Sequence, residues 1–469
     1  MADSHLDFPS YFDWNTQAHP LLPQTCAIPR PTLAQLEHVT FDDEGPRDGV
    51  QGTTVFPGAR DVQRYVQLAH DTGLREITVG IFSGEGSRAE QVTMSVLKHM
   101  AKHFADMTPI IIVRPLPIDL AYAKRCFEAN PNIEVLIFQG SSSPRLWVQG
   151  WAREQVLDGI ATAIDFVAAH AGGRSLSTLE DASRTDPQFV SDFLEMSVKH
   201  KAVRVVFADT TGHFDPWGAY RFIRFVKEKL DSLGTVGKKM KIDFHGHRDR
   251  YLDMPVALAA ISAGTDRVHG VVFGIGERAG NTVLDALIYN VARMIEELGG
   301  KHSYVLAKLP ELCRQYAVMT RESIPNHYPL VGENAFLTAV GIHADAQEKG
   351  LKLLDELESK GLSDAKRKEV EKILRTIYTS VDHEELGRIL RYLIGPLSGD
   401  ASIRMWLYSQ GYDVVLGEDH PVVTKIRKFA KQQNRVLRDE EIIELLEREK
   451  IKRMRQAQPS RTRRLAPHP

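Results

Sequence analysis

Eight short segments rich in β-branched and apolar residues recur in the first part of the chain, and helical patterns lie between them. The strand-like segments lie near residues 37–41, 75–80, 109–113, 133–138, 174–179, 203–208, 240–244 and 267–273. The amphipathic stretches include residues 61–72, 154–170, 187–200, 217–233 and 254–263. Eight strands alternating with helices predict an α/β fold of the (β/α)8 TIM-barrel type.

An open doubly wound sheet is the main alternative to the barrel. Such a sheet would carry a glycine-rich phosphate loop directly after its first strand. The first predicted strand is followed instead by the acidic residues Asp42, Asp43 and Glu44. We therefore favour the barrel.

The pattern changes after residue 300, where helices dominate and only residues 324–345 are rich in loops. The expected helices cover residues 303–320, 346–360, 364–378, 383–393 and 439–453. We expect a catalytic barrel over residues 36–300 and a mostly helical C-terminal extension over residues 301–455. Residues 1–35 predict an N-terminal arm that could cover a partner subunit, and residues 456–469 a disordered basic tail.

Composition excludes several classes of protein. The chain has 469 residues, of which 43% are hydrophobic, and its formal net charge of −2 argues against nucleic-acid binding as its main role. Its three cysteines are far apart and form neither a disulfide framework nor a thiolate cluster, which fits a reducing cytoplasm. The chain lacks a signal-peptide pattern and an apolar run long enough to span a membrane. We expect a cytoplasmic protein.

Polar and glycine-rich residues follow the predicted strands at several of their carboxyl ends. These segments are Arg47–Gln51, Glu180–Arg184, Asp209–Gly212, His245–His247 and Gly274–Asn281. In a (β/α)8 barrel these ends converge on one face, where active sites form. We therefore expect the active site on this face.

His245, Gly246 and His247 end the seventh predicted strand. The two histidines are two positions apart, so both side chains point to the same face, and the glycine lets a ligand or backbone approach. The pair alone is equally consistent with two polar strand-end histidines. With the carboxylate of Asp48, however, it suits a divalent ion (Mn, Mg, Co or Zn).

Three motifs in this order resemble those of a known enzyme group. Arg47-Asp48-Gly49-x-Gln51, His245-x-His247 and the Gly274–Asn281 run are similar to motifs of the acyl-CoA Claisen-condensing synthases of the metal-dependent TIM-barrel lyase group. This group contains the 2-isopropylmalate, homocitrate, citramalate and Re-citrate synthases and, more distantly, hydroxymethylglutaryl-CoA lyase. The resemblance covers residues 38–345. It implies condensation of acetyl-CoA with a 2-oxo acid, thioester hydrolysis, and a homodimer.

The resemblance also implies roles for three further residues. Asn281 matches a position used as an additional oxygen ligand or as support for the ligands. Glu180 matches the active-site glutamate that polarises the base or the acetyl group. His343, in a segment resembling the synthases' helical subdomain, is expected to act as acid or base on the acetyl methyl group, since imidazole titrates near neutral pH. A structural histidine in a loop is the alternative for His343.

The remaining polar residues have more than one interpretation. Arg47 is expected to neutralise the substrate carboxylate or an oxyanion, or else to pair with a neighbouring acid. Gln51 belongs to the same motif and is expected at the substrate. Thr211 or Thr210 is expected to bind the substrate carboxylate, or else to close the strand and cap the next helix. His269 is interpreted as structural.

Two arginines bear on the choice of 2-oxo acid. Arg248 stands where an asparagine usually follows the second histidine, and Arg114 ends the third predicted strand. Leu176 occupies the position of the arginine with which homocitrate synthases hold the distal carboxylate of 2-oxoglutarate, which speaks against a standard homocitrate synthase. Arg114 and Arg248 favour a dicarboxylic acid such as oxaloacetate, giving citrate, although either could simply be ion-paired.

Other functions stay open. A 2-isopropylmalate or homocitrate synthase would use the same chemistry. A lyase of the hydroxymethylglutaryl-CoA type would carry a cysteine near the eighth strand, where Cys26, Cys126 and Cys313 do not lie, and would end soon after the barrel. A non-catalytic barrel that binds metal or acyl-CoA would be favoured if ligand residues were missing, but Asp48, His245 and His247 are present.

Overall fold

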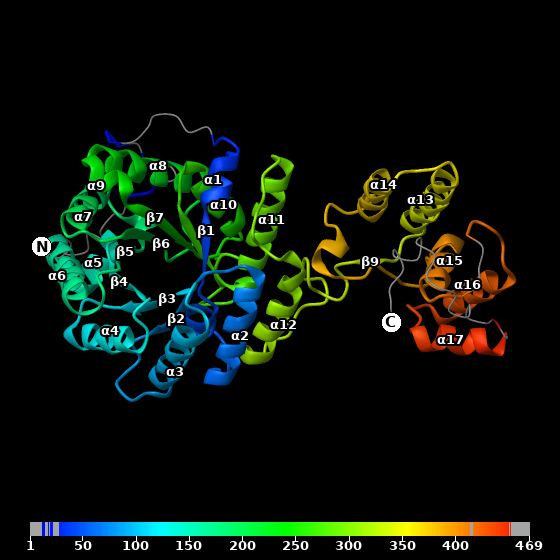
Figure 1. The fold of residues 1–469 in the computed structure, drawn as a ribbon, viewed down its shortest axis with the longest axis horizontal. Coiled ribbons are helices and arrows are strands. Elements are labelled where there is room, and N and C mark those ends of the chain that lie inside the picture. Colours follow the sequence, from blue (N-terminus) through cyan, green and yellow to red (C-terminus); the bar gives the residue numbers. More distant parts are fainter. Residues whose placement is uncertain are drawn as a thin grey trace, which may run out of the picture. The chain divides into compact units, whose positions relative to one another are not determined.

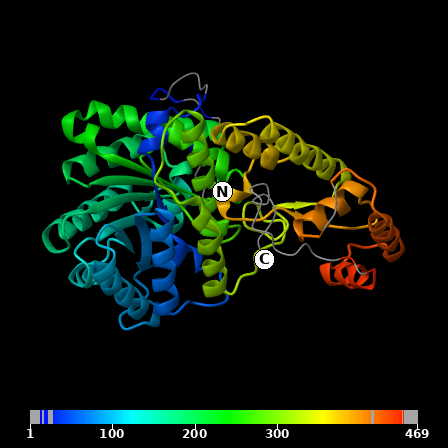
Figure 2. The same cartoon turned by 45° about the vertical axis from the view of Figure 1, so that its right-hand side comes forward.

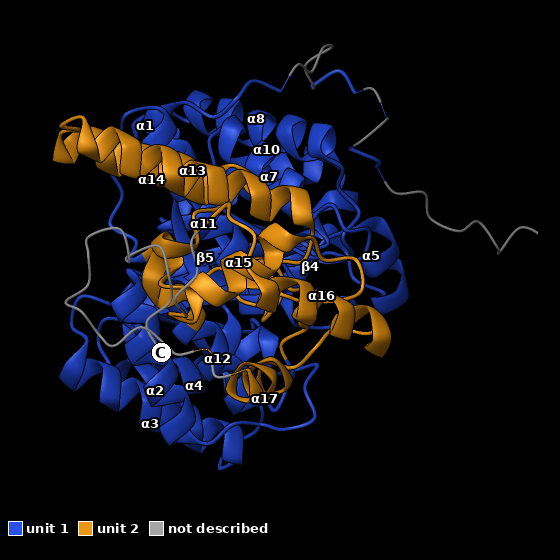
Figure 3. Ribbon diagram, turned by 90° about the vertical axis from the view of Figure 1, so that its right-hand side faces the viewer, with its two compact units in different colours: residues 1–305, 311–323 blue, residues 306–310, 324–469 orange. Residues whose placement is uncertain are grey.

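The computed structural model describes residues 12–14, 17, 19–21, 28–412, 416–449 and 451. It divides into two compact units (Figure 3). Unit 1 comprises residues 1–305 and 311–323, and unit 2 comprises residues 306–310 and 324–469. The expected basic tail at 456–469 and most of the N-terminal arm lie outside the described residues.

Unit 1 is a closed barrel of eight parallel strands arranged in chain order (Figures 1 and 2). The strands are β1 (Thr40–Asp43), β2 (Glu76–Ile81), β3 (Thr108–Val113), β4 (Glu134–Gly140), β5 (Ser175–Glu180), β6 (Arg204–Asp209), β7 (Lys241–Gly246) and β8 (Arg267–Gly270). Pairing of β1 with β8, in which Asp42 lies opposite His269, closes the sheet. The predicted (β/α)8 barrel is confirmed.

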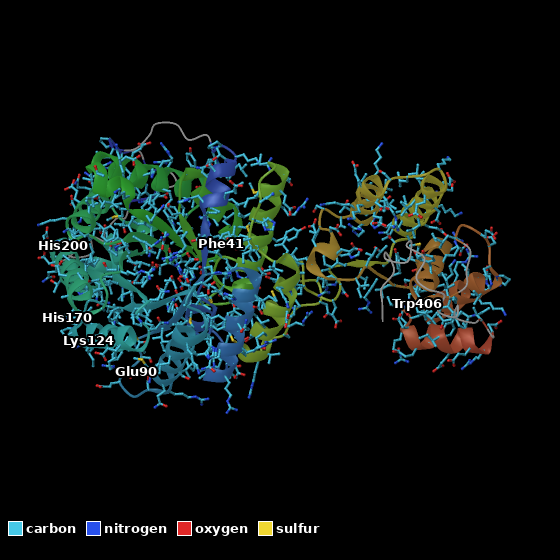
Figure 4. The ribbon with its side chains drawn as sticks, viewed as in Figure 1. Phe41, Glu90, Lys124, His170, His200 and Trp406 are labelled. Atoms are coloured by element: carbon cyan, nitrogen blue, oxygen red, sulfur yellow. The ribbon has the colours of Figure 1, made fainter. Side chains whose placement is uncertain are left out.

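Helices cover the outside of the strands. They are α1 (Leu33–His38), α2 (Ala59–Thr72), α3 (Arg88–His103), α4 (Pro117–Ala129), α5 (Ser143–Gln149), α6 (Arg153–His170), α7 (Pro187–Lys199), α8 (Pro216–Ser232), α9 (Gly234–Lys239), α10 (Asp253–Ala263), α11 (Leu284–Glu297) and α12 (Leu309–Thr320). In α2, Val62, Tyr65, Val66 and Ala69 are buried at the spacing of one helix face. Figure 4 shows Phe41, which is 1% exposed, within this unit.

The start of the first strand differs from the prediction. Residues 37 and 38 belong to helix α1, because Thr32 and Gln35 cap its first turn reciprocally and so favour a helix over a strand. Strand β1 begins only at Thr40.

The amino-terminal halves of the strands carry a cluster of buried and half-buried charges, which we call the floor: Glu76, Glu134, Arg204, Asp243 and Arg267. Arg267 Nη1 lies 2.9 Å from Glu134 Oε2, and its Nη2 lies 2.6 Å from Asp243 Oδ2. Arg204 Nε lies 2.7 Å from the other Asp243 oxygen. An apolar cluster from strands β3, β4, β5 and β6 packs inside the barrel: Ile110, Ile112, Leu136, Leu176 and Val206.

Two segments outside the strands also belong to unit 1. Helix α12, expected among the C-terminal helices, packs its buried Tyr316 on Tyr65 with ring centroids 5.5 Å apart. In the N-terminal arm, Trp14 is buried on the chain's own barrel. Its indole Nε1 donates to the carbonyl oxygen of Thr185 at 2.9 Å, and its ring meets Phe222 edge-on.

Unit 2 is mostly helical, as expected. It contains α13 (Gly341–Ser359), α14 (Asp364–Thr376), α15 (Asp400–Ser409), α16 (Pro421–Gln433), α17 (Asp439–Arg448) and a parallel pair of short strands, β9 (Leu337–Thr338) and β10 (Arg391–Tyr392). Its core includes Trp406, labelled in Figure 4. The helix predicted for residues 383–393 is wrong. A short turn, His383–Leu386, ends at Gly387 with φ 59°, and the chain then enters β10.

Among the described residues, no helix is both long enough and apolar enough to cross a membrane.

Candidate active site

A cavity of about 300 Å³ lies at the carboxyl ends of the barrel strands. Its polar lining consists of Glu44, Arg47, Asp48, Gln51, Arg145, Thr178, Glu180, Thr210, His245, His247, His269 and Glu277. Apolar residues of strands β3, β4 and β6 complete the wall. The cavity therefore lies on the face expected to carry the active site.

Three ligand-type side chains converge at this cavity. His245 Nε2 lies 3.2 Å from His247 Nε2 and 3.5 Å from Asp48 Oδ2. One ligand atom from each of the three residues lies within 4.8 Å of the other two. Asp48 reaches the histidines because the π-helical turn η1 (Gly45–Gly49) follows β1 directly. The predicted group of one carboxylate and two imidazoles is thus brought together.

The hydrogen bonds behind the two histidines fix which nitrogen carries the proton. His245 Nδ1 lies 3.0 Å from Glu44 Oε1, and His247 Nδ1 lies 3.1 Å from the carbonyl oxygen of Gly280. Both partners only accept, so each Nδ1 is protonated and donates. Burial and the nearby His245 lower the pKa of His247 to about 4, which keeps it neutral. With both histidines neutral, two Nε2 lone pairs and an Asp48 oxygen face one another.

This donor set fits a divalent cation. Neutral imidazole nitrogens oriented by acceptors behind them, together with one carboxylate, are typical ligands of Zn, Mn or Co ions. A cation between the three atoms would relieve the repulsion of their lone pairs.

Asn281 adds a candidate oxygen ligand. Its backbone pairs with that of His247 in an isolated antiparallel bridge, and its Nδ2 donates to Asp48 Oδ2 at 2.8 Å. Its Oδ1 is buried and has no hydrogen-bond partner among the described residues. Gly276 is required for this arrangement, because a Cβ at that position would lie 2.0 Å from the Asn281 Oδ1.

Glu44 and His269 form a link that the sequence interpretation missed. Glu44 Oε1 accepts from the Nδ1 of His269 at 2.7 Å as well as from His245, and Glu44 Oε2 lies 3.1 Å from Arg47 Nη1. Although burial opposes ionisation, His245, His269 and Arg47 hold the pKa of Glu44 well below its usual range. Glu44 is therefore a carboxylate that orients His245.

His269 connects this site with the floor. Its Nε2 lies 3.3 Å from Asp243 Oδ2. Burial lowers its pKa, but Asp42, Asp243 and Glu44 together raise that pKa to about 9. The sequence offered one signal for this role. His269 follows Arg267 by two positions on β8, so the two side chains point to the same face of the strand. His269 and Glu44 both line the cavity, although His269 was interpreted only as structural.

Glu180 ends β5 on another wall of the cavity. Burial raises its pKa, and Arg145 opposes this rise, with the Arg145 Nε 3.3 Å from the Glu180 Oε1. Arg145 was not anticipated, because it lies on helix α5 rather than at a strand end. Arg184, near Glu180 in sequence, pairs with Asp181.

Comparison with known proteins agrees with this geometry. The model of the family described as HMGL-like matches residues 38–314, more than half of the chain. The chain belongs to the HMGL-like family.

Curated relatives of this HMGL-like chain are synthases. The "2-isopropylmalate synthase 2" of Caldanaerobacter subterraneus subsp. tengcongensis is 26% identical over 86% of this chain and 93% of that protein. The "Homocitrate synthase AksA" of Methanothermobacter thermautotrophicus is 26% identical over 86% of this chain and 92% of its own length. The membership in the metal-dependent TIM-barrel synthase group is confirmed.

Solved structures agree at the level of the fold. Hydroxymethylglutaryl-CoA lyase from Pseudomonas aeruginosa superposes with a TM-score of 0.52 at 17% identity, covering 61% of this chain and 94% of that one. An HMG-CoA lyase crystallised with coenzyme A and 3-methylmalate gives a TM-score of 0.51 at 19% identity, covering 62% of this chain and 93% of that one.

The structure does not bring all the expected residues of the HMGL-like barrel to the cavity. Arg114 is held by two hydrogen bonds of 2.9 Å to the buried Asp119, and its half-exposed side chain is outside the lining. Arg248 donates to the carbonyl oxygen of Ala279 and is also outside the lining. Thr211 lines a neighbouring pocket of about 360 Å³. Thr210 lines both this pocket and the main cavity.

His343 lies in unit 2. It is in the first turn of α13, where its ring stacks on Tyr378 with centroids 3.9 Å apart. Its expected role as acid or base stays a prediction.

Proposed function

We propose that the protein condenses acetyl-CoA with a 2-oxo acid in a metal-dependent reaction and then hydrolyses the thioester. The observation that carries this proposal is the convergence of three ligand atoms, from Asp48, His245 and His247, at the wall of a cavity large enough for a small acid. The names of the curated relatives, which are 2-isopropylmalate and homocitrate synthases, support the reaction class.

The chain's own residues have distinct roles in this proposal. Asp48, His245 and His247, with Asn281 beside them, would hold a divalent ion, which polarises a bound ketone and stabilises negative charge on its oxygen. The metal itself could be Mn, Mg, Co or Zn.

Three more residues would act on the substrates. Arg47, beside Asp48, would neutralise the carboxylate next to the ketone, and Gln51 would contact the same substrate. Glu180, whose pKa is raised by burial, would hold a proton near the acetyl group. His343 would exchange the proton of the acetyl methyl group.

We further propose that the 2-oxo acid is dicarboxylic, with oxaloacetate giving citrate as the favoured pair. Arg114, one of the two arginines behind this expectation, is engaged by Asp119 instead. The preference must therefore rest on another cation of the cavity lining. We also propose a homodimer, which sedimentation of the purified chain tests.

Release of free CoA thiol tests the reaction. The purified chain, loaded with Mn²⁺, is incubated with acetyl-CoA and oxaloacetate, 2-oxoglutarate, 2-oxoisovalerate or pyruvate in turn. We expect acid-dependent release that is abolished in His245→Ala and His247→Ala while circular dichroism stays unchanged. Metal binding without thiol release from any acid would instead indicate a binding protein. Cleavage of 3-hydroxy-3-methylglutaryl-CoA without condensation would indicate a lyase.

A further inference from the structure

Resting on the proposed function, we propose that Arg145 binds the distal carboxylate of a dicarboxylic 2-oxo acid and so determines the substrate class. Arg47 and Arg145 both place a guanidinium at the cavity. Arg47 lies between Glu44 and Asp48, at 3.1 and 3.2 Å, on the side of the metal ligands. Arg145 comes from helix α5 and lies beside Glu180, so it is placed to meet the other end of a bound acid.

The backbone makes room for Arg145 at this position. An ideal Cβ on Gly140, the last residue of β4, would lie 2.3 Å from the Arg145 Cγ and 2.9 Å from its Nε. The absence of a side chain at Gly140 therefore lets the arginine stem cross the end of β4. The guanidinium also lies over the Trp151 ring, 5.7 Å from its centroid, which restricts its direction further.

Arg145 has donor capacity beyond its contact with Glu180. The Arg145 Nε and the Glu180 Oε1 form an ion pair 3.3 Å apart that lacks hydrogen-bond geometry. The Arg145 Nε is therefore buried without a hydrogen-bond partner among the described residues. A guanidinium carries five N–H donors in a planar fork that matches a carboxylate. A substrate carboxylate would supply the missing acceptor.

A second unpartnered donor lies on the same wall. Thr178 precedes Glu180 by two residues on β5, and its buried Oγ1 has no hydrogen-bond partner in the described structure although the residue lines the cavity. The surrounding wall is apolar, with Ile112, Leu136 and Val206. An acid with an alkyl end would bring no acceptor to this wall, whereas a second carboxylate would bring one.

Matched pairs of acids test the assignment without turnover. 2-Oxoglutarate and 2-oxopentanoate have equal carbon chains and differ only in carboxylate against methyl at the end, as do oxaloacetate and 2-oxobutanoate. Titration calorimetry with the Mn²⁺-loaded full chain, in the absence of acetyl-CoA, measures each dissociation constant. We expect the dicarboxylate to bind at least 100-fold more tightly within the pair whose length fits the cavity.

Three variants locate the source of this preference. Arg145→Met should weaken dicarboxylate binding about 100-fold and change binding of the methyl-ended acid less than threefold, with Mn²⁺ affinity unchanged. Gly140→Ala should weaken the dicarboxylate selectively while retaining the guanidinium in the chain. Arg114→Met, which removes an arginine outside the cavity, is the matched control and should leave both acids unaffected.

The outcomes separate this proposal from the proposed reaction. Equal affinity of the wild type for both members of each pair, or an equal loss of both in Arg145→Met, would overturn the role of Arg145. Selective binding without CoA release in the thiol assay would refute the condensation and leave the assignment of Arg145 in place.

Discussion

The two ends of the barrel use the same kinds of residue in opposite ways. In the floor, Arg267 and Arg204 lie within 3 Å of Asp243 or Glu134, so these four groups form direct ion pairs. At the mouth, by which we mean Glu44, Asp48, His245, His247 and Asn281, three ligand atoms lie within 4.8 Å of one another, and Arg47 pairs with Asp48 at 3.2 Å. Strand β7 serves both ends, with Asp243 in the floor and the histidines at the mouth. Closed pairs favour stability, and open ligand sets favour binding.

Breaking a floor pair should have the largest effect. Arg267→Met leaves Asp243 and Glu134 buried with one cationic partner fewer, so we expect a loss of about 3–5 kcal/mol in the free energy of unfolding. Urea unfolding followed by tryptophan fluorescence measures it. The control is Arg64→Met, which breaks an exposed ion pair with Glu311 and should cost at most about 1 kcal/mol. Equal losses in the two variants would remove the distinction between floor and surface.

His269, which lies between the floor and the mouth, should make the free energy of unfolding depend on pH. The pKa of His269 is raised to about 9 in the folded chain, against about 6.5 when unfolded. Its contribution is therefore fully present below about pH 6.5 and is lost as the pH rises to about 9. The loss is at most about 3 kcal/mol. Unfolding between pH 6 and 9.5 should show this slope in the wild type and a flatter one in His269→Gln. If His269→Gln showed the same slope as the wild type, the raised pKa of His269 would be contradicted.

A mouth variant should spare stability and remove metal binding. His247→Asn retains a donor for the Gly280 carbonyl oxygen but loses the Nε2 lone pair. Without metal we expect a change of less than about 1 kcal/mol in the free energy of unfolding. Metal at 100 times its dissociation constant should stabilise the wild type by about 2.7 kcal/mol and the variant hardly at all. Melting with and without Mn²⁺ measures both. If His247→Asn were strongly destabilised without metal, His247 would contribute to stability as the floor residues do.

The smallest effect is expected for the residue that orients a ligand. Glu44→Gln keeps the size of the side chain but loses the carboxylate that accepts from both His245 and His269. Metal affinity, measured by calorimetry, should fall about 10- to 100-fold. Glu277→Gln makes the same change at an exposed residue of the cavity rim and should alter it less than threefold. Equal losses would show that cavity charge, rather than orientation, controls affinity.

Strand periodicity explains why much of this molecule could be predicted. Alternation fixed which face His245 and His247 share, and strand ends of a barrel meet, so their approach to Asp48 followed from order alone. Arg145 could not be placed this way, because it depends on the path of a helix past Gly140. The same holds for Arg114, whose partner Asp119 lies on the following helix. The tautomer of His245 depends on Glu44, which precedes a π-helical turn that local patterns do not reveal.

The closure of β1 against β8 has a consequence for synthesis on the ribosome. Asp48 and its partner Asn281 are separated by 233 positions, so at usual elongation rates the first waits about 10–50 s for the second to be made. During that time the edge of β1 that later meets β8 is unpaired. No N-terminal fragment ending before Asn281 contains all four proposed cation donors, Asp48, His245, His247 and Asn281. Binding of an ion by the full proposed set would therefore report that translation has passed β8 and that the ring is shut.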